Sequence, residues 1–123
     1  MSDFVMSVNN FTKKAVESII EARKQAQMDV GEAVATRNPV DTGLSSGNWI
    51  GNKDAPATYS KPLYSTQAQN VALAQQGAFG EDGTWYLVNN VDYAYYIEFG
   101  SSTIRPHAMA RKGVQEVADK LGK

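Results

Sequence analysis

The sequence predicts an α+β fold in which a long N-terminal helix and a C-terminal helix pack on a small, mainly antiparallel sheet. Three observations predict it. Apolar residues recur every three or four positions through the first third of the chain, short aromatic and β-branched runs follow, and helical spacing returns after Pro106. Helices at both ends with a few strands between them are typical of a sheet covered by helices.

Size and composition limit the chemistry of this chain. Its 123 residues correspond to a single domain, 1–123. It has no Cys and one His, which excludes thiol nucleophiles, iron–sulfur clusters and four-ligand zinc sites. No segment is apolar enough to suggest a membrane span or a signal peptide. We therefore expect no cofactor, no metal and no membrane partner.

The first helix is predicted over residues 7–37, with Ser2 or Ser7 as its N-cap and Pro39 ending it. Its apolar stripe is a single series with helical spacing: Phe4, Val8, Phe11, Ala15, Ile19, Ala22, Ala26, Val30 and Ala33. Gly31 is the weakest position in the series, because Gly costs about 1 kcal/mol relative to Ala inside a helix.

The length of this helix predicts self-association. Residues 7–37 would span about 45 Å, whereas a compact chain of this size has a diameter of roughly 35 Å. Part of the stripe should lie outside its own domain, and exposed apolar stripes mark partner surfaces. The expected oligomer interface is Phe4, Val8, Phe11, Ala15 and Ile19. The alternative is a bend at Gly31 that folds the last turns back.

The sheet region is expected over residues 39–100. A turn at Val40–Gly43 leads to a strand that begins at Asn48–Trp49. Loops, expected to be mobile, occupy about 51–64 and 77–84. Between them, residues 66–76 form a short helix or an ordered excursion. A second strand covers Trp85–Asn89.

The end of the chain is expected to be helical. Residues 92–100 alternate as a strand would, but Asp92 as a cap and Gly100 as a stop slightly favour a helical turn. Pro106 in a first-turn position opens a last helix over 106–121. Its expected buried face comprises Met109, Ala110, Val114, Val117 and Leu121.

The Asp41-Thr42-Gly43 triplet is the sharpest enzymatic candidate, because it resembles the active-site loop of dimeric aspartic proteases, in which two carboxylates share a proton. Leu44 follows the triplet where that family has a small residue, and a long N-terminal helix does not belong in an all-β protease. A tight turn is the favoured interpretation.

Other polar and aromatic candidates favour structural roles. His107 is expected to lie on the surface or in packing, and Glu98 to bond a loop or pair with a cation, Arg105 being close in sequence. The aromatic residues of the middle region are expected in the core rather than on a stacking platform. They are Trp49, Trp85, Tyr93, Tyr95, Tyr96 and Phe99.

Charge is distributed unevenly along the chain. Residues 39–100 carry two basic and six acidic side chains, a net charge of −4, and residues 101–123 carry five basic and two acidic ones, a net charge of +3. Such blocks could pair between neighbouring copies. Basic residues do not interleave with aromatic ones as in nucleic-acid-binding surfaces, which disfavours specific nucleic-acid binding.

Several segments together resemble the neck and tail-completion proteins of tailed bacteriophages, including relatives of minor tail protein Z. The resemblance covers residues 39–121, in order. Its segments are Pro39-Val40-Asp41-Thr42-Gly43, Asn48-Trp49, Val88-Asn89-Asn90, Tyr93 to Gly100, and Arg105-Pro106-His107-Ala108-Met109. The matching positions form the expected structural signature: Asp41, Thr42, Gly43, Trp49, Asn89, Tyr93, Tyr96, Glu98, Phe99, Gly100, Arg105 and Pro106.

The resemblance implies a non-enzymatic virion protein that forms a ring of six or twelve copies at the head-to-tail junction. It would assemble in the bacterial host cytoplasm, contact neighbouring connector or tail proteins, and pass DNA only as non-specific cargo. Ring contacts would use the long helix of one subunit against the sheet or last helix of the next. The alternatives are an aspartic-protease-like homodimer using Asp41 and a generic protein-binding adaptor module.

Overall fold

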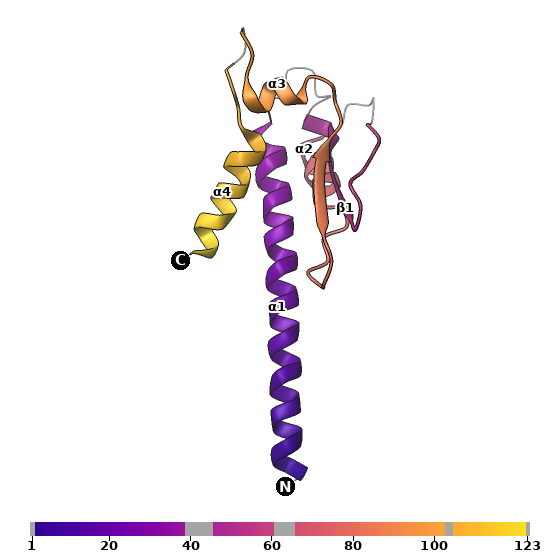
Figure 1. Ribbon diagram of the computed structural model, residues 1–123, viewed down its shortest axis with the longest axis vertical. Coiled ribbons are helices and arrows are strands. Elements are labelled where there is room, and N and C mark those ends of the chain that lie inside the picture. Colours follow the sequence, from indigo (N-terminus) through magenta and orange to yellow (C-terminus); the bar gives the residue numbers. More distant parts are fainter. Residues whose placement is uncertain (1, 39–45, 61–65, 103–104, 123) are drawn as a thin grey trace.

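The computed structural model describes residues 2–38, 46–60, 66–102 and 105–122, and its fold is the predicted α+β arrangement (Figure 1). The elements in chain order are α1 (Ser2–Arg37), a 3-10 turn η1 (Ser46–Asn48), β1 (Trp49–Lys53), α2 (Gln67–Ala74), β2 (Trp85–Asn89), α3 (Ala94–Phe99) and α4 (Met109–Leu121).

Helix α1 is one continuous helix of 36 residues, about 54 Å long at 1.5 Å per residue. It begins at Ser2 and not at Ser7. The alternative of a bend at Gly31 is wrong, because this glycine lies buried against α2 in an unbroken helix. A Cβ atom at position 31 would lie 2.8 Å from the carbonyl oxygen of Ala74. The absent side chain thus lets two backbones approach closely.

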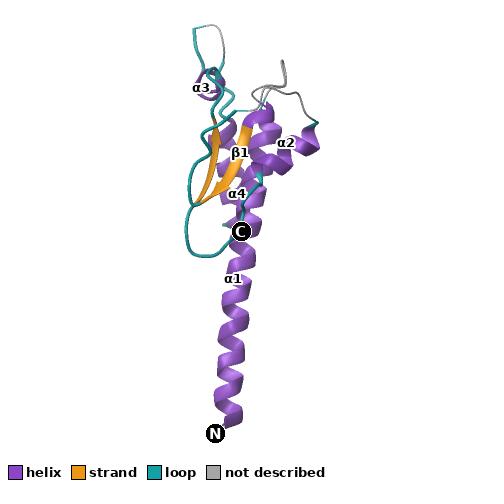
Figure 2. Cartoon of the chain, turned by 90° about the vertical axis from the view of Figure 1, so that its right-hand side faces the viewer, coloured by secondary structure: helices purple, strands orange, loops and turns teal. Residues whose placement is uncertain are grey.

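All other elements surround the C-terminal half of α1, and its N-terminal half extends away from them (Figures 1 and 2). The sheet, α2 and α4 contact the C-terminal half of α1, and α3 caps the end of the body opposite the N-terminus (Figure 1). The helix is therefore longer than the body that packs on it, as the comparison of its predicted length with the diameter of a compact chain indicated.

The sheet has two antiparallel strands, with Trp49 opposite Asn89 and Lys53 opposite Trp85. Strand β2 has the predicted bounds. Strand β1 continues to Lys53, so the prediction that residues 51–53 belong to a loop is wrong: they pair with Leu87, Tyr86 and Trp85. Gly51 permits this because a Cβ there would lie 2.6 Å from the carbonyl oxygen of Ala74 in the covering helix α2.

The shorter helices follow the predicted segments closely. The helical alternative for residues 66–76 is confirmed by α2, which Thr66 caps by a capping box with Gln69. The helical alternative for 92–100 is confirmed by α3, which Gly100 closes at φ 85°. The N-cap of α3 is Tyr93, so the prediction of Asp92 as its cap is wrong.

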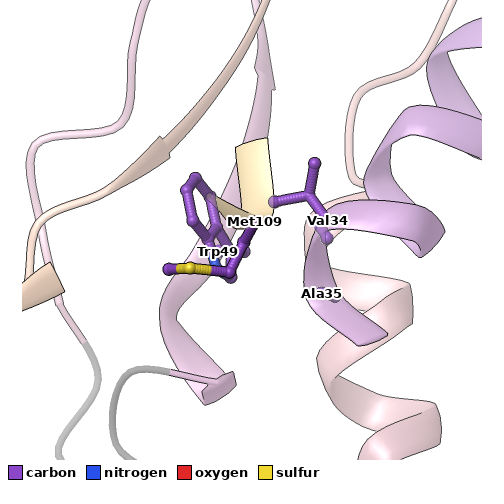
Figure 3. Close-up of a cluster of buried hydrophobic side chains, with 5 residues drawn as sticks. Val34, Ala35, Trp49 and Met109 are labelled. Atoms are coloured by element: carbon purple, nitrogen blue, oxygen red, sulfur yellow. The ribbon is translucent and has the colours of Figure 1, made fainter. Parts of the chain in front are cut away.

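The buried core joins four elements through a few side chains. Val34 and Ala35 of α1, Trp49 of β1, Ala74 of α2 and Met109 of α4 form one cluster (Figure 3). The indole of Trp49 also donates a hydrogen bond of 2.9 Å to the buried Asn38 side chain directly after α1. The end of the long helix, the start of the sheet and the last helix are thereby fixed to one another.

The last helix starts at Met109, so the prediction that it begins at Pro106 is wrong. The backbone amides of His107 and Ala108 donate to the carbonyl oxygens of Ile97 and Glu98, at 2.7 and 3.1 Å. Ala108 has a left-handed φ of 49°, which no helical residue adopts. His107 and Ala108 thus bond to α3 before the helical turns begin.

Gly113 of α4 lies directly against Val34 of α1. A Cβ there would lie 2.7 Å from Cγ2 of Val34 and 3.0 Å from its backbone nitrogen. We expect Gly113→Ala to lower the free energy of unfolding by about 1–3 kcal/mol through overpacking, although Ala is the better helix former by about 1 kcal/mol. Urea denaturation measures the change.

The matched control is Gly122→Ala. At position 122, φ is −78° and the nearest atom to an added Cβ lies 3.5 Å away, so Ala fits. An equal loss of stability in both variants, or a gain in Gly113→Ala, would contradict the close packing of α4 on α1.

Candidate functional site

Part of the predicted signature lies outside the described residues. Asp41, Thr42 and Gly43 are among these positions, so the structure does not bear on the turn or on the aspartic-protease alternative. The same holds for the side chains of Phe4 and Val8 in the predicted oligomer interface.

The described signature residues of the sheet have structural roles. Trp49 belongs to the core, and the side-chain oxygen of Asn89 accepts a hydrogen bond of 3.1 Å from the backbone amide of Val91, at the turn after β2. Arg105 and Pro106 are exposed in the segment before α4. Trp49 and Asn89 therefore stabilise the start of β1 and the turn after β2, whereas Arg105 and Pro106 lie on the surface.

Glu98 joins α3 to the N-terminus of α4. Its buried carboxylate accepts hydrogen bonds from the backbone amide of Ala110 at 2.8 Å and from Nε of Arg111 at 2.9 Å. Nη2 of Arg111 also donates to the Glu98 carbonyl oxygen at 2.6 Å. Glu98 has the predicted structural role. Its partner cation, however, is Arg111 and not Arg105, which was expected only because it lies close to Glu98 in the sequence.

The same carboxylate replaces a conventional cap. Ala108, the N-cap of α4, has no side chain that can accept a hydrogen bond, and the Glu98 oxygens accept from the first helical amides instead. A negative charge at a helix N-terminus is also favoured by the helix dipole. α3 is thus held to α4 by a cap supplied from another element.

Burial raises the pKa of Glu98, but hydrogen bonds from Ala110 and Arg111 and the Arg111 charge outweigh it. The net effect is a pKa below the ordinary value of 4.5. The charged form is therefore the one that the fold stabilises, and a proton donor or acceptor working near neutral pH would need the opposite shift.

The aromatic residues of α3, together with its N-cap Tyr93, form an exposed surface. Tyr93, Tyr95, Tyr96 and Phe99 are 37–64% exposed, so their predicted place in the core is wrong. The reason is that the six-residue helix α3 lies at one end of the body, with only a small contact to α4 (Figure 1). We call these four residues the α3 aromatic patch.

The α3 aromatic patch is ordered by its own contacts. The rings of Tyr95 and Phe99 lie 4.9 Å apart between centroids, and those of Tyr95 and Tyr96 meet edge to face at 5.7 Å. The guanidinium of Arg111 lies 4.6 Å from the Phe99 ring centroid. Arg111 therefore connects the patch to the Glu98 cap.

The projecting half of α1 carries a second exposed apolar surface. Phe11 is 74% exposed, Val16 51% and Ile19 60%, and Ala15 is half-buried. Val16 was not part of the predicted stripe. The structure thus leaves the described part of the expected interface, Phe11, Ala15 and Ile19, largely uncovered within its own chain.

An apolar groove lies beside this surface, between α1, β2 and α4. Its volume is about 410 Å³. The lining residues are Ala26, Gln27, Val30, Trp85, Leu87, Val114, Val117, Ala118 and Leu121. Val114, Val117 and Leu121 share one face of α4, as their spacing predicts. Because α4 diverges from α1 toward its C-terminus (Figure 1), Val114 and Leu121 remain exposed and border the groove, which no local sequence pattern shows.

The described residues contain no cluster of three or more potential metal ligands. Within the same part of the chain, every helix is too short or too polar to cross a bilayer. Comparisons with family models, curated proteins and solved structures each found no match to this chain. Three candidate functional features stand out among the described residues. They are the apolar residues Phe11, Ala15, Val16 and Ile19 of α1, which we call the projecting stripe, the groove, and the α3 aromatic patch.

The Glu98 cap gives a pH-dependent prediction. Since the pKa of Glu98 is lower in the folded than in the unfolded chain, its stabilisation is complete above pH 4.5 and disappears as the pH falls through the folded value. We expect Glu98→Gln to lower the free energy of unfolding by about 1.5–3 kcal/mol at pH 7, and by less in acid. Urea denaturation at a series of pH values measures both effects.

Glu116→Gln is the matched control. Glu116 pairs with Arg37 at 2.8 Å, but the two side chains are 41% and 36% exposed, and such surface pairs contribute about 0–1 kcal/mol. If Glu98→Gln lowered the free energy of unfolding by no more than Glu116→Gln does, the cap would not hold α3 to α4 as described.

Proposed function

We propose that this protein is a structural virion protein of a tailed bacteriophage, forming an oligomeric ring at the neck, where head and tail join and DNA passes. The observation that carries the proposal is the half of α1 that extends beyond the body with Phe11, Val16 and Ile19 exposed. The resemblance of residues 39–121 to neck and tail-completion proteins supplies the phage setting.

The energetics favour covering the projecting stripe. Full burial of a Phe, Val or Ile side chain contributes about 1.5–3 kcal/mol. Three such side chains, each more than half exposed, offer a gain that association must set against lost rotational and translational freedom. A closed ring helps because every subunit uses two interfaces, so no apolar stripe is left uncovered.

The arrangement also supports a non-enzymatic role. The carboxylate of Glu98 is occupied in capping α4, and large apolar and aromatic side chains such as Phe11, Ile19 and Tyr95 are exposed. Such surfaces recognise other proteins. Neighbouring connector or tail proteins would therefore dock on surfaces outside the ring contact, and the α3 aromatic patch at the far end of the body is suited to this.

Charging the projecting stripe tests the proposal. We expect the native protein to assemble into rings of defined copy number, and the double variant Phe11→Asp with Ile19→Asp to be monomeric, because each ring contact would then bury two carboxylates. Native mass spectrometry gives the copy number, and negative-stain electron microscopy shows whether the assembly is a closed ring.

The matched control is the double variant Asn10→Asp with Ser18→Asp. It adds the same number of charges on exposed neighbouring positions of α1, each 100° around the helix from the mutated residue. The control should assemble like the native chain. A native protein that remains monomeric at high concentration would refute the ring.

A further inference from the structure

One wall of the groove is a single face of α4. Val114, Val117, Ala118 and Leu121 stand at positions i, i+3, i+4 and i+7, the spacing of one helix face. Val117 is buried, but Val114 and Leu121 remain 51% and 68% exposed. The chain covers only one side of this face, where α4 packs on α1.

The projecting stripe and the groove belong to one apolar surface. Along α1, Phe11, Ala15 and Ile19 continue in helical spacing to Ala26 and Val30, and the last two line the groove. Ala26 and Val30 thus belong to a groove wall, while no other described element lies beside the N-terminal half of α1 (Figure 1). A helix docked in the groove would contact the same apolar face of α1 that carries Phe11 and Ile19 farther along.

The two surfaces match in length. Phe11 to Ile19 spans about 12 Å of helix, and Val114 to Leu121 spans about 10 Å, at 1.5 Å per residue. Two turns of an amphipathic helix with anchors at i, i+4 and i+8 fit an apolar groove of that length. The groove volume of about 410 Å³ suits such anchors.

The chain cannot place its own stripe in its own groove. Helix α1 is unbroken from Ser2 to Arg37, so Phe11 lies about 22 Å along the axis from Ala26, the nearest groove residue of the same helix. Docking of this segment therefore requires a second molecule.

Charge is complementary as well. The segment Phe11–Ile19 carries Lys13 and Lys14 against Glu17, a net charge of +1, whereas Arg23, farther along α1, already pairs with Asp82 of its own chain at 3.8 Å. The β2 wall of the groove begins at Trp85, directly after a loop that exposes Glu81 and Asp82. A basic helix segment arriving beside this loop would be attracted to it.

We infer that the groove between α1, β2 and α4 binds the projecting part of α1, around Phe11–Ile19, from a second copy of this chain. The inference rests on the proposed ring and specifies its contact. Each subunit offers the helix segment on one side and the groove on the other, so the contact is heterologous and propagates from copy to copy until the ring closes.

Cysteine cross-linking tests the contact directly, because the native chain contains no Cys. Phe11→Cys is combined with Val114→Cys in one protein and with Leu121→Cys in another, which covers both directions in which the helix can lie. A disulfide needs Cα atoms within about 7 Å, a distance that Phe11 cannot reach within its own chain. We expect one of the two pairs to give a ladder of disulfide-linked oligomers on non-reducing gels after mild oxidation.

The control pair is Phe11→Cys with Ala72→Cys. Ala72 is exposed on α2 and does not line the groove. This pair should give no ladder, and each single-Cys variant should give at most a dimer. A double variant Val114→Asp with Leu121→Asp, folded by circular dichroism, should lose assembly and appear at the monomer mass.

The outcomes separate the two proposals. If rings form and depend on the projecting stripe but neither groove pair cross-links, the groove is not the docking site and the ring proposal stands. If the native chain remains monomeric alone, or assembles only with a different protein, both self-docking and the ring are overturned. A ladder from the control pair equal to that from the groove pairs would show contact without specificity and would also overturn the inference.

Discussion

The structure depends on the packing of α2, α4 and the start of the sheet against the last turns of α1. Gly31 lets α2 approach α1, Val34 meets Gly113 of α4, and Asn38 accepts the hydrogen bond of Trp49 from the sheet. A small body with a two-stranded sheet has little apolar area of its own, since isolated two-stranded sheets are marginally stable. The C-terminal half of α1 provides the apolar surface that the sheet and the short helices need. The N-terminal half makes no part of this core and projects from the body (Figure 1).

The end of the body that lies farthest from the N-terminus, where α3 is, is held together by polar contacts (Figure 1). Helix α3 has six residues and contributes little to the core, yet it is joined to α4 by the Glu98 carboxylate and by the backbone bonds of His107 and Ala108. Arg111 completes this link and also covers the face of Phe99. A helix held in this way can expose its aromatic side chains without losing its position, because its stability does not depend on burying them.

The sequence predicted the helices and the second strand well because periodicity and capping are local properties. The length of α1 and the helical form of residues 94–99 follow from such signals. Other features depend on distant segments that no local pattern identifies. Gly31 lies against Ala74 of α2, and Glu98 pairs with Arg111 of α4, both far away in sequence. The aromatic residues of α3 were misplaced because burial depends on whether another element covers them.

The shared use of α1 has a geometric consequence for assembly. The projecting stripe and one wall of the groove are parts of the same unbroken helix, so their distance and relative rotation are fixed within each subunit. When such a subunit binds its neighbour through these two different surfaces, the same rotation is repeated at every step, and closure depends on that rotation alone. In the proposed ring, an unbroken helix would fix this rotation more precisely than two surfaces joined by a hinge would.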